Sequence, residues 1–185
     1  MRFVLHYRGP LHANGSVKEK HQIRQHVHAQ LAQLWRQQPL TDYPELVKER
    51  TSPGNYSLLR PSFGFTFVPL VTKEMNAIAE LSVTLLRPEA PGNLITQGGD
   101  IDNRLKTLFD ALTMPRHEAQ VQGISPVEDE KPFFYCLFED DNLVTAISVR
   151  TEQLLESSDD KALVDLLVDV ETRVTRPTMS NGFLG

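Results

Sequence analysis

Two short acidic clusters could supply the oxygen ligands of a metal ion. The first, Asp100 and Asp102, follows a glycine pair, and the second, Asp140 and Asp141, begins 38 residues after Asp102. Neighbouring carboxylates repel one another, and a cation between them relieves that repulsion. Mg²⁺ prefers a few carboxylates, with water and substrate phosphate completing its shell. The clusters therefore predict a Mg²⁺ site, with Mn²⁺ as the alternative ion, provided that the fold brings them together.

A predicted helix over residues 102–114 carries part of the first cluster. Its apolar residues recur at i, i+3, i+4 and i+7, the spacing of one buried face: Leu105, Leu108, Phe109 and Leu112. Asp102, Lys106 and Asp110 follow at i, i+4 and i+8 on a second face. An alternative without chemistry stays open. Asp100 or Asp102 could be the N-cap of the helix, and the other charges a solvated ladder.

The two motifs together resemble the RusA family of Holliday-junction resolvases. Residues 100–112 read Asp-Ile-Asp-Asn-Arg-Leu-Lys-Thr-Leu-Phe-Asp-Ala-Leu, and residues 140–144 read Asp-Asp-Asn-Leu-Val. The family pattern is D-x-D-N-x-x-K-x-x-x-D-A-L, followed by D-D-x-x-V. From its first to its last residue the match spans about a quarter of the chain, and it is specific because it fixes two clusters and their order.

The resemblance implies a function and assigns roles to single residues. It implies a small α/β fold, a Mg²⁺-dependent endonuclease, and a homodimer that cuts branched DNA symmetrically. By motif position, Asp100, Asp102 and Asp141 match the metal-binding acids, and Lys106 matches the essential lysine. Three further motif residues are expected to support the site: Asn103, Asp110 and Asp140.

Composition and length indicate one globular domain of ordinary character. The chain has 185 residues, 40% of them hydrophobic and 23% charged, enough to bury a sizeable core. We expect a nuclease domain over residues 1–175 and a loose C-terminal tail over 176–185. Cys136 is the single cysteine and lies in an apolar run, which indicates a core thiol and fits a cytoplasmic protein. No signal peptide and no membrane span are expected.

The distribution of charge bears on DNA binding. The net charge is −5, but residues 1–60 hold nine Lys or Arg and four Asp or Glu, a balance of +5. A nuclease needs positive charge facing phosphate, so weak DNA contacts are assigned to Lys18, Lys20, Arg24 and Arg104. The acidic remainder of the chain favours an alternative, a non-catalytic RusA-like module that binds nucleic acid or a protein partner. A metal-dependent phosphohydrolase acting on a small molecule also stays open.

The remaining elements follow from periodicity and from turn residues. Alternation predicts strands over residues 2–8, 63–71, 80–85 and 163–174, with a hairpin plausible between the second and third. Ser16 followed by Glu19 predicts a capping box that opens a helix to about Gln38. Residues 114–131, rich in acids, are expected to form a surface excursion. The fold class is α/β: a mixed, largely antiparallel sheet with two helices packed against it.

Overall fold

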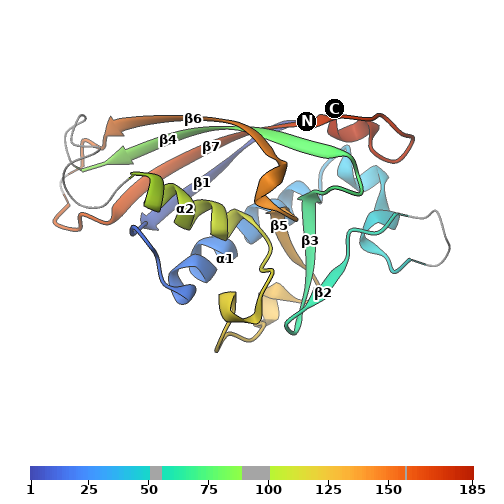
Figure 1. Ribbon diagram of the computed structural model, residues 1–185, viewed down its shortest axis with the longest axis horizontal. Coiled ribbons are helices and arrows are strands. Elements are labelled where there is room, and N and C mark those ends of the chain that lie inside the picture. Colours follow the sequence, from blue (N-terminus) through green and yellow to red (C-terminus); the bar gives the residue numbers. More distant parts are fainter. Residues whose placement is uncertain (51–55, 89–100, 157) are drawn as a thin grey trace.

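The protein contains a long four-stranded sheet with mixed strand directions (Figure 1). The computed structural model describes residues 1–50, 56–88, 101–156 and 158–185. The strands run in the order β1 (Arg2–Pro10), β7 (Leu163–Val174), β4 (Ala77–Arg87) and β6 (Val144–Gln153). β1 and β4 are both antiparallel to β7, whereas β6 is parallel to β4. Along β4 and β7 every second residue is buried, so these alternating sequences form one core-facing surface.

A second, three-stranded sheet lies beside the first (Figure 1). Its order is β2 (Arg60–Ser62), β3 (Phe65–Val71) and β5 (Phe134–Phe138), with β3 and β5 parallel. The α/β prediction is thus confirmed at the level of a mixed fold, but both sheets are mixed rather than largely antiparallel. The suggested hairpin is wrong. β3 and β4 belong to different sheets, and residues 72–76 carry the chain from one sheet to the other.

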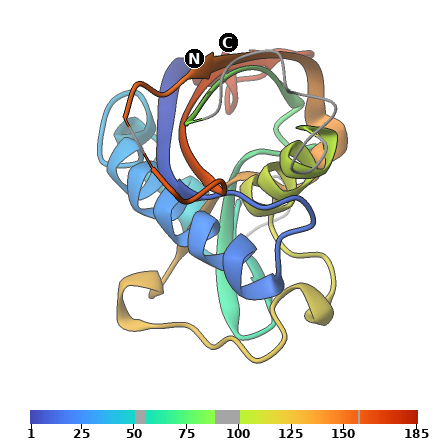
Figure 2. The same ribbon diagram turned by 90° about the vertical axis from the view of Figure 1, so that its left-hand side faces the viewer.

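Two helices lie on the concave side of the four-stranded sheet (Figure 2). They are α1 (Val17–Leu34) and α2 (Ile101–Leu112). α1 begins where expected, because the Ser16 side chain accepts a hydrogen bond from the Glu19 amide at 3.2 Å. The Glu19 carboxylate accepts from the His12 amide instead of completing a capping box. α1 ends before the predicted Gln38, since the chain approaches Pro39 and the residue before a proline disfavours helical geometry.

Two apolar clusters hold these layers together. The larger one joins the inner face of the four-stranded sheet to both helices, with Ile23, Val27 and Leu31 of α1 fully or almost fully buried. The smaller one gathers five side chains under the 114–131 segment: Phe65, Phe67, Val121, Phe134 and Cys136. Burial raises the pKa of the Cys136 thiol, in keeping with the predicted core thiol. Phe63, in contrast, lies exposed in the turn between β2 and β3.

The C-terminal segment is packed rather than loose. Phe183 and Leu184 are buried in the larger cluster, and the buried Asn181 amide donates to the Met75 and Arg176 carbonyls at 2.8 and 3.0 Å. The Met1 ammonium donates to the Leu184 carbonyl at 2.9 Å. The expectation of a loose tail over 176–185 was wrong because two apolar side chains anchor the segment.

The two edges of the four-stranded sheet differ. At β1, the Gln30 side chain of α1 accepts from the His6 amide at 2.9 Å and donates to the His6 carbonyl at 2.6 Å. At β6, nearly every residue is exposed, and the described part of the chain adds no strand beyond it. No helix in the described ranges has the length and apolar character needed to cross a membrane.

Candidate metal-binding groove

A groove of about 510 Å³ brings the two acidic motifs together. We call it the acidic groove; its lining residues are Asp102, Leu105, Lys106, Phe109, Asp110, Asp141, Asn142 and Ile147. One wall is the exposed face of α2. The other is the 3₁₀ turn Asp141–Leu143 and the first half of β6. Asp102 and Asp141, 39 positions apart in the sequence, thus face one space.

Asp102 lies in the first turn of α2 and is exposed. Its carboxylate accepts a hydrogen bond from the Asn103 amide at 2.9 Å. Since α2 begins at Ile101, Asp102 is inside the helix and the N-cap alternative does not hold for it. The positive end of the helix dipole favours an anion at this position. The corresponding interpretation of Asp100 lies outside the described residues.

Lys106 stands one turn further along and is also exposed. The solvated ladder considered for the α2 charges does not form: among the described residues, neither Asp102 nor Lys106 makes an ion pair. Asp110 pairs instead with Lys20 of α1 at 2.7 Å. The groove therefore presents a carboxylate and an ammonium with no ionic partner in the described chain, a combination that can receive a ligand carrying both charges.

The second motif is held by Asp140, the N-cap of the 3₁₀ turn. Its carboxylate accepts from the Asn142 amide at 2.9 Å and pairs with Lys73 at 3.5 Å and with Arg116. Partial burial would raise the pKa of Asp140, but the Asn142 hydrogen bond and the charges of Arg116 and Lys73 outweigh it and lower the pKa. Asp140 thus orders the turn that presents Asp141, whose carboxylate is 61% exposed.

Arg116 reaches both acids of this motif. Its Nη2 atom lies 2.7 Å from Asp141 Oδ1 and also contacts Asp140. The sequence did not indicate Arg116, because residues 114–131 carry no motif. Lys73 was missed because residues 72–76, between β3 and β4, carry none either. Asn142 stood in the quoted motif without an assigned role. Ile147 could have been suspected because it lies in strand β6, only six residues after Asp141.

Hard oxygen ligands are present in the groove, and the second motif holds a positive charge. Asp102 and Asp141 offer exposed carboxylates, Asn142 offers an amide oxygen, and the Arg116 guanidinium shows that the Asp140–Asp141 pair accommodates a cation. Within the described ranges, no three His, Cys, Asp or Glu side chains lie close enough together to hold a metal by themselves. A Mg²⁺ ion at Asp102 and Asp141 would take further ligands from water and substrate. Asp100 lies outside the described residues.

Two of the four predicted DNA contacts are wrong. Arg24 is 1% exposed and donates to the Asp110 carbonyl at 2.9 Å, and Arg104 is 4% exposed and donates to the Leu11 carbonyl. Each arginine satisfies a backbone acceptor inside the protein. Burial lowers the pKa of Arg24 to about 10, so it remains charged at neutral pH. Lys18 is exposed, and Lys20 is partly exposed beside Asp110.

The α1–α2 contact fixes the groove in the fold. The Arg24 guanidinium binds a carbonyl in the last turn of α2, where such groups lack helical partners. In the middle of α2, Thr107 Oγ1 accepts from the Gly15 amide at 2.9 Å. A Cβ atom at Gly15 would come within 2.6 Å of the Thr107 methyl. A glycine is therefore needed for the loop before α1 to approach α2.

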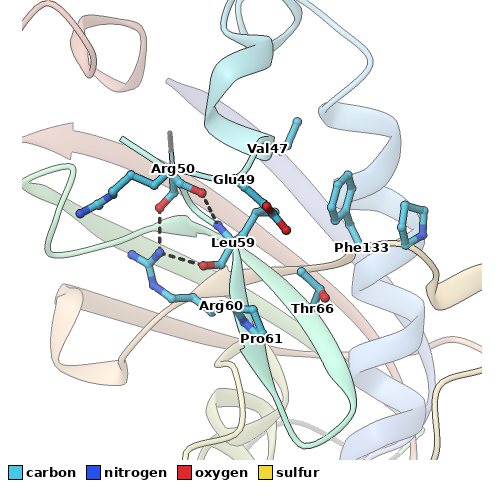
Figure 3. Close-up of a pocket in the computed structure, with 10 residues that line it drawn as sticks. Val47, Glu49, Arg50, Leu59, Arg60, Pro61, Thr66 and Phe133 are labelled. Atoms are coloured by element: carbon cyan, nitrogen blue, oxygen red, sulfur yellow. Dashed lines mark hydrogen bonds between the residues drawn. The ribbon is translucent and has the colours of Figure 1, made fainter. Parts of the chain in front are cut away.

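A second cavity, of about 640 Å³, lies next to β2 (Figure 3). We call it the arginine cavity; it is lined by Val47, Glu49, Arg50, Ser57, Leu59, Arg60, Pro61, Thr66, Pro132 and Phe133. Arg60 Nε donates to Glu139 at 2.8 Å and its Nη2 to Glu74 at 3.1 Å. Arg50 also pairs with Glu74. The arginines and nearby acids thus neutralise one another.

Comparisons with protein-family models, with curated proteins and with solved structures found no match to this chain.

Proposed function

We propose that this protein is a Mg²⁺-dependent endonuclease that hydrolyses phosphodiesters in branched DNA, as its resemblance to the RusA family implies. One observation carries the proposal: Asp102 and Lys106 of the first motif line one groove with Asp141 of the second, although the two motifs are distant in sequence. A structural role for the acids alone would not require that convergence. The exposure of Asp102 and Lys106, which make no ion pair within the described chain, adds support, because neither side chain has to lose an ionic partner before it binds a ligand.

Each charged residue of the acidic groove has its own proposed role. Asp102 and Asp141, with Asp100 by motif position, would hold the ion. When bound, Mg²⁺ polarises a phosphodiester and lowers the pKa of a coordinated water. Lys106 neutralises negative charge that develops on a phosphate oxygen or on the leaving group. Asp140 orders the turn that carries Asp141, and Asp110, held by Lys20, supports the α2 face.

The apolar part of the groove orients a bulky substrate. Leu105 and Phe109 of α2 face Ile147 of β6, which is 51% exposed. These side chains border the charged groups and reduce the access of water to one side of them, which strengthens nearby electrostatic interactions. Lys73 and Arg116, both exposed, add positive charge beside the acids, and positive charge near the scissile bond attracts a polyanionic substrate.

A cleavage assay tests the proposal. Four-way junctions, flaps and linear duplexes of the same base composition are incubated with the protein and Mg²⁺, with EDTA as the control. We expect Mg²⁺-dependent cuts in branched DNA and much weaker cleavage of the linear duplex. Binding to branched DNA with no cleavage of any substrate would instead favour the non-catalytic module, and hydrolysis confined to small phosphodiesters would favour the phosphohydrolase.

Symmetric resolution of a junction requires two active sites, so we further propose a homodimer, the commonest symmetric assembly. Light scattering at micromolar concentration checks this prediction. A monomer at that concentration would contradict junction resolution, although nicking of a single strand would remain compatible with it.

A further inference from the structure

Arg116 bridges the two acids of the second motif, one of which, Asp141, lines the acidic groove. Its guanidinium contacts Asp140 and lies 2.7 Å from Asp141 Oδ1, and its side chain is 43% exposed. Asp140 has two further partners, the Asn142 amide, through which it caps the turn, and Lys73, whereas the structure gives Asp141 no ion pair besides Arg116 within the described chain. Arg116 therefore competes with any cation that uses the Asp141 carboxylate.

The backbone around Arg116 is fixed, and its side chain has room to turn. The Met114 amide donates to the Phe138 carbonyl at 2.9 Å, and the Arg116 amide donates to Gln120 Oε1 at 2.7 Å. Further along, Val121 is buried and Glu130 is bound by Gln25 of α1 at 2.7 Å. The 114–131 segment is thus anchored on both sides of Arg116, which keeps the guanidinium within reach of the groove.

We propose that Arg116 is a switchable counter-ion of the acidic groove: it holds Asp141 in the metal-free protein and turns to a phosphate of the bound DNA when a divalent cation takes its place. This inference rests on the proposed function. A guanidinium and a divalent cation on one carboxylate repel each other, so metal binding weakens the Arg116–Asp141 pair. A guanidinium binds a phosphate in two-point contact as well as it binds a carboxylate, so the released side chain, which is 43% exposed beside Asp141, can take a phosphate of the bound DNA.

Mn²⁺ binding to the metal-free protein, followed by calorimetry, tests the first half of the switch. The variants are Arg116→Gln, the charge-keeping Arg116→Lys, and the matched control Arg173→Gln. Arg173 also spans two carboxylates, Glu80 at 3.1 Å and Glu171 at 3.3 Å, but neither lines the groove. We expect Arg116→Gln to bind Mn²⁺ more tightly than the parent by up to about fivefold, as the loss of an exposed pair of this kind implies. Arg116→Lys and Arg173→Gln should stay close to the parent.

Binding of a four-way junction in Ca²⁺ at several salt concentrations tests the second half. Loss of one phosphate contact reduces the slope of log K against log salt by about 0.9. We expect that reduction in Arg116→Gln and the parental slope in Arg173→Gln.

The outcomes separate this inference from the proposed function. If the parent binds Mn²⁺ and Arg116→Gln binds it equally or more weakly, the switch is overturned while the metal site stands. An unchanged salt slope overturns the transfer to phosphate. Mn²⁺ binding by Arg116→Gln but not by the parent supports the switch in its strongest form. Failure of both proteins to bind Mn²⁺ removes the metal site and the switch with it.

Discussion

The acidic groove and the arginine cavity are similar in volume but opposite in how their charges are used. In the arginine cavity, Arg60 contacts Glu74, Glu139 and two backbone carbonyls, so its charge is neutralised inside the protein. In the acidic groove, Asp102 and Lys106 face solvent without an ionic partner in the described chain. The larger cavity is therefore a structural junction, and the smaller groove retains charge that can act on a ligand. Unpaired charge identifies the site better than volume does.

The largest expected effect comes from Asp102→Asn. The amide oxygen can still accept from the Asn103 amide, so the melting temperature of the metal-free protein should change little. As a metal ligand, however, a neutral amide is poor, and cleavage of branched DNA should fall roughly a hundredfold or more, the scale of losing one strong transition-state contact. The matched control is Glu74→Gln beside the arginine cavity, which should cleave normally. Unchanged cleavage by Asp102→Asn would defeat the mechanism.

Lys106→Met probes the cation of the groove. Because Lys106 is exposed and has no ion-pair partner among the described residues, its replacement should leave thermal stability unaltered. Cleavage should fall by about tenfold to a hundredfold, since one charge that stabilises the transition state is lost. Mn²⁺ binding should persist. A variant that cleaves at the parental rate, with KM also unchanged, would show that Lys106 has no part in cleavage.

Arg60→Gln should produce the reverse result, a loss of stability with little effect on cleavage. The Arg60 side chain is 23% exposed and Glu74 and Glu139 are similarly shielded. Without the guanidinium, two partly buried carboxylates repel, and we expect a loss of about 1 kcal/mol after allowing for solvent screening. Urea unfolding measures this quantity. A stable variant with impaired cleavage would contradict the division of roles between the two cavities.

The smallest effect concerns pH and a third charged cluster, which joins α1 to the 114–131 segment. Burial lowers the pKa of His21; Glu130, 3.1 Å away, opposes the shift and Arg24 adds to it. Below about pH 6.5 the unfolded chain takes up a proton that the folded His21 resists, so the free energy of unfolding falls as the pH falls. His21→Gln should flatten this fall below about pH 6.5. If the free energy of unfolding falls equally with pH in the variant and in the parent, this role of His21 is contradicted.

Sequence patterns predicted where strands and helices lie far better than they predicted which elements pack against one another. Strict alternation located Leu163–Val174 to the residue, and the apolar spacing located α2. Alternation could not show that β3 and β4 enter different sheets, because a strand's face pattern is the same whichever neighbour it has. The prediction of a loose tail failed for a related reason. Phe183 and Leu184 are too few to show a periodic pattern, yet two buried apolar side chains are enough to anchor a short segment.

The errors about charge have a common cause. Arg24 and Arg104 were assigned to DNA because a nuclease needs positive charge facing phosphate, but each is buried and donates to a backbone carbonyl. A positional signal existed for Arg24, which lies at i−3 from Val27 and i−7 from Leu31 on the apolar face of α1. No such signal existed for Arg116. Its place beside the acids depends on how residues 114–131 return along β5, which local sequence does not encode.

The two edges of the four-stranded sheet differ in their ability to pair with a further strand. Gln30 blocks β1 at its midpoint, while no strand of the described ranges pairs with the outer edge of β6 along its ten residues. An incoming strand can therefore extend the sheet at one end and not at the other. Such a strand would lie against the wall that Ile147 contributes to the acidic groove. Under the proposed function, a chain paired at this edge would lie beside the groove wall and would restrict the access of DNA to Asp102 and Asp141.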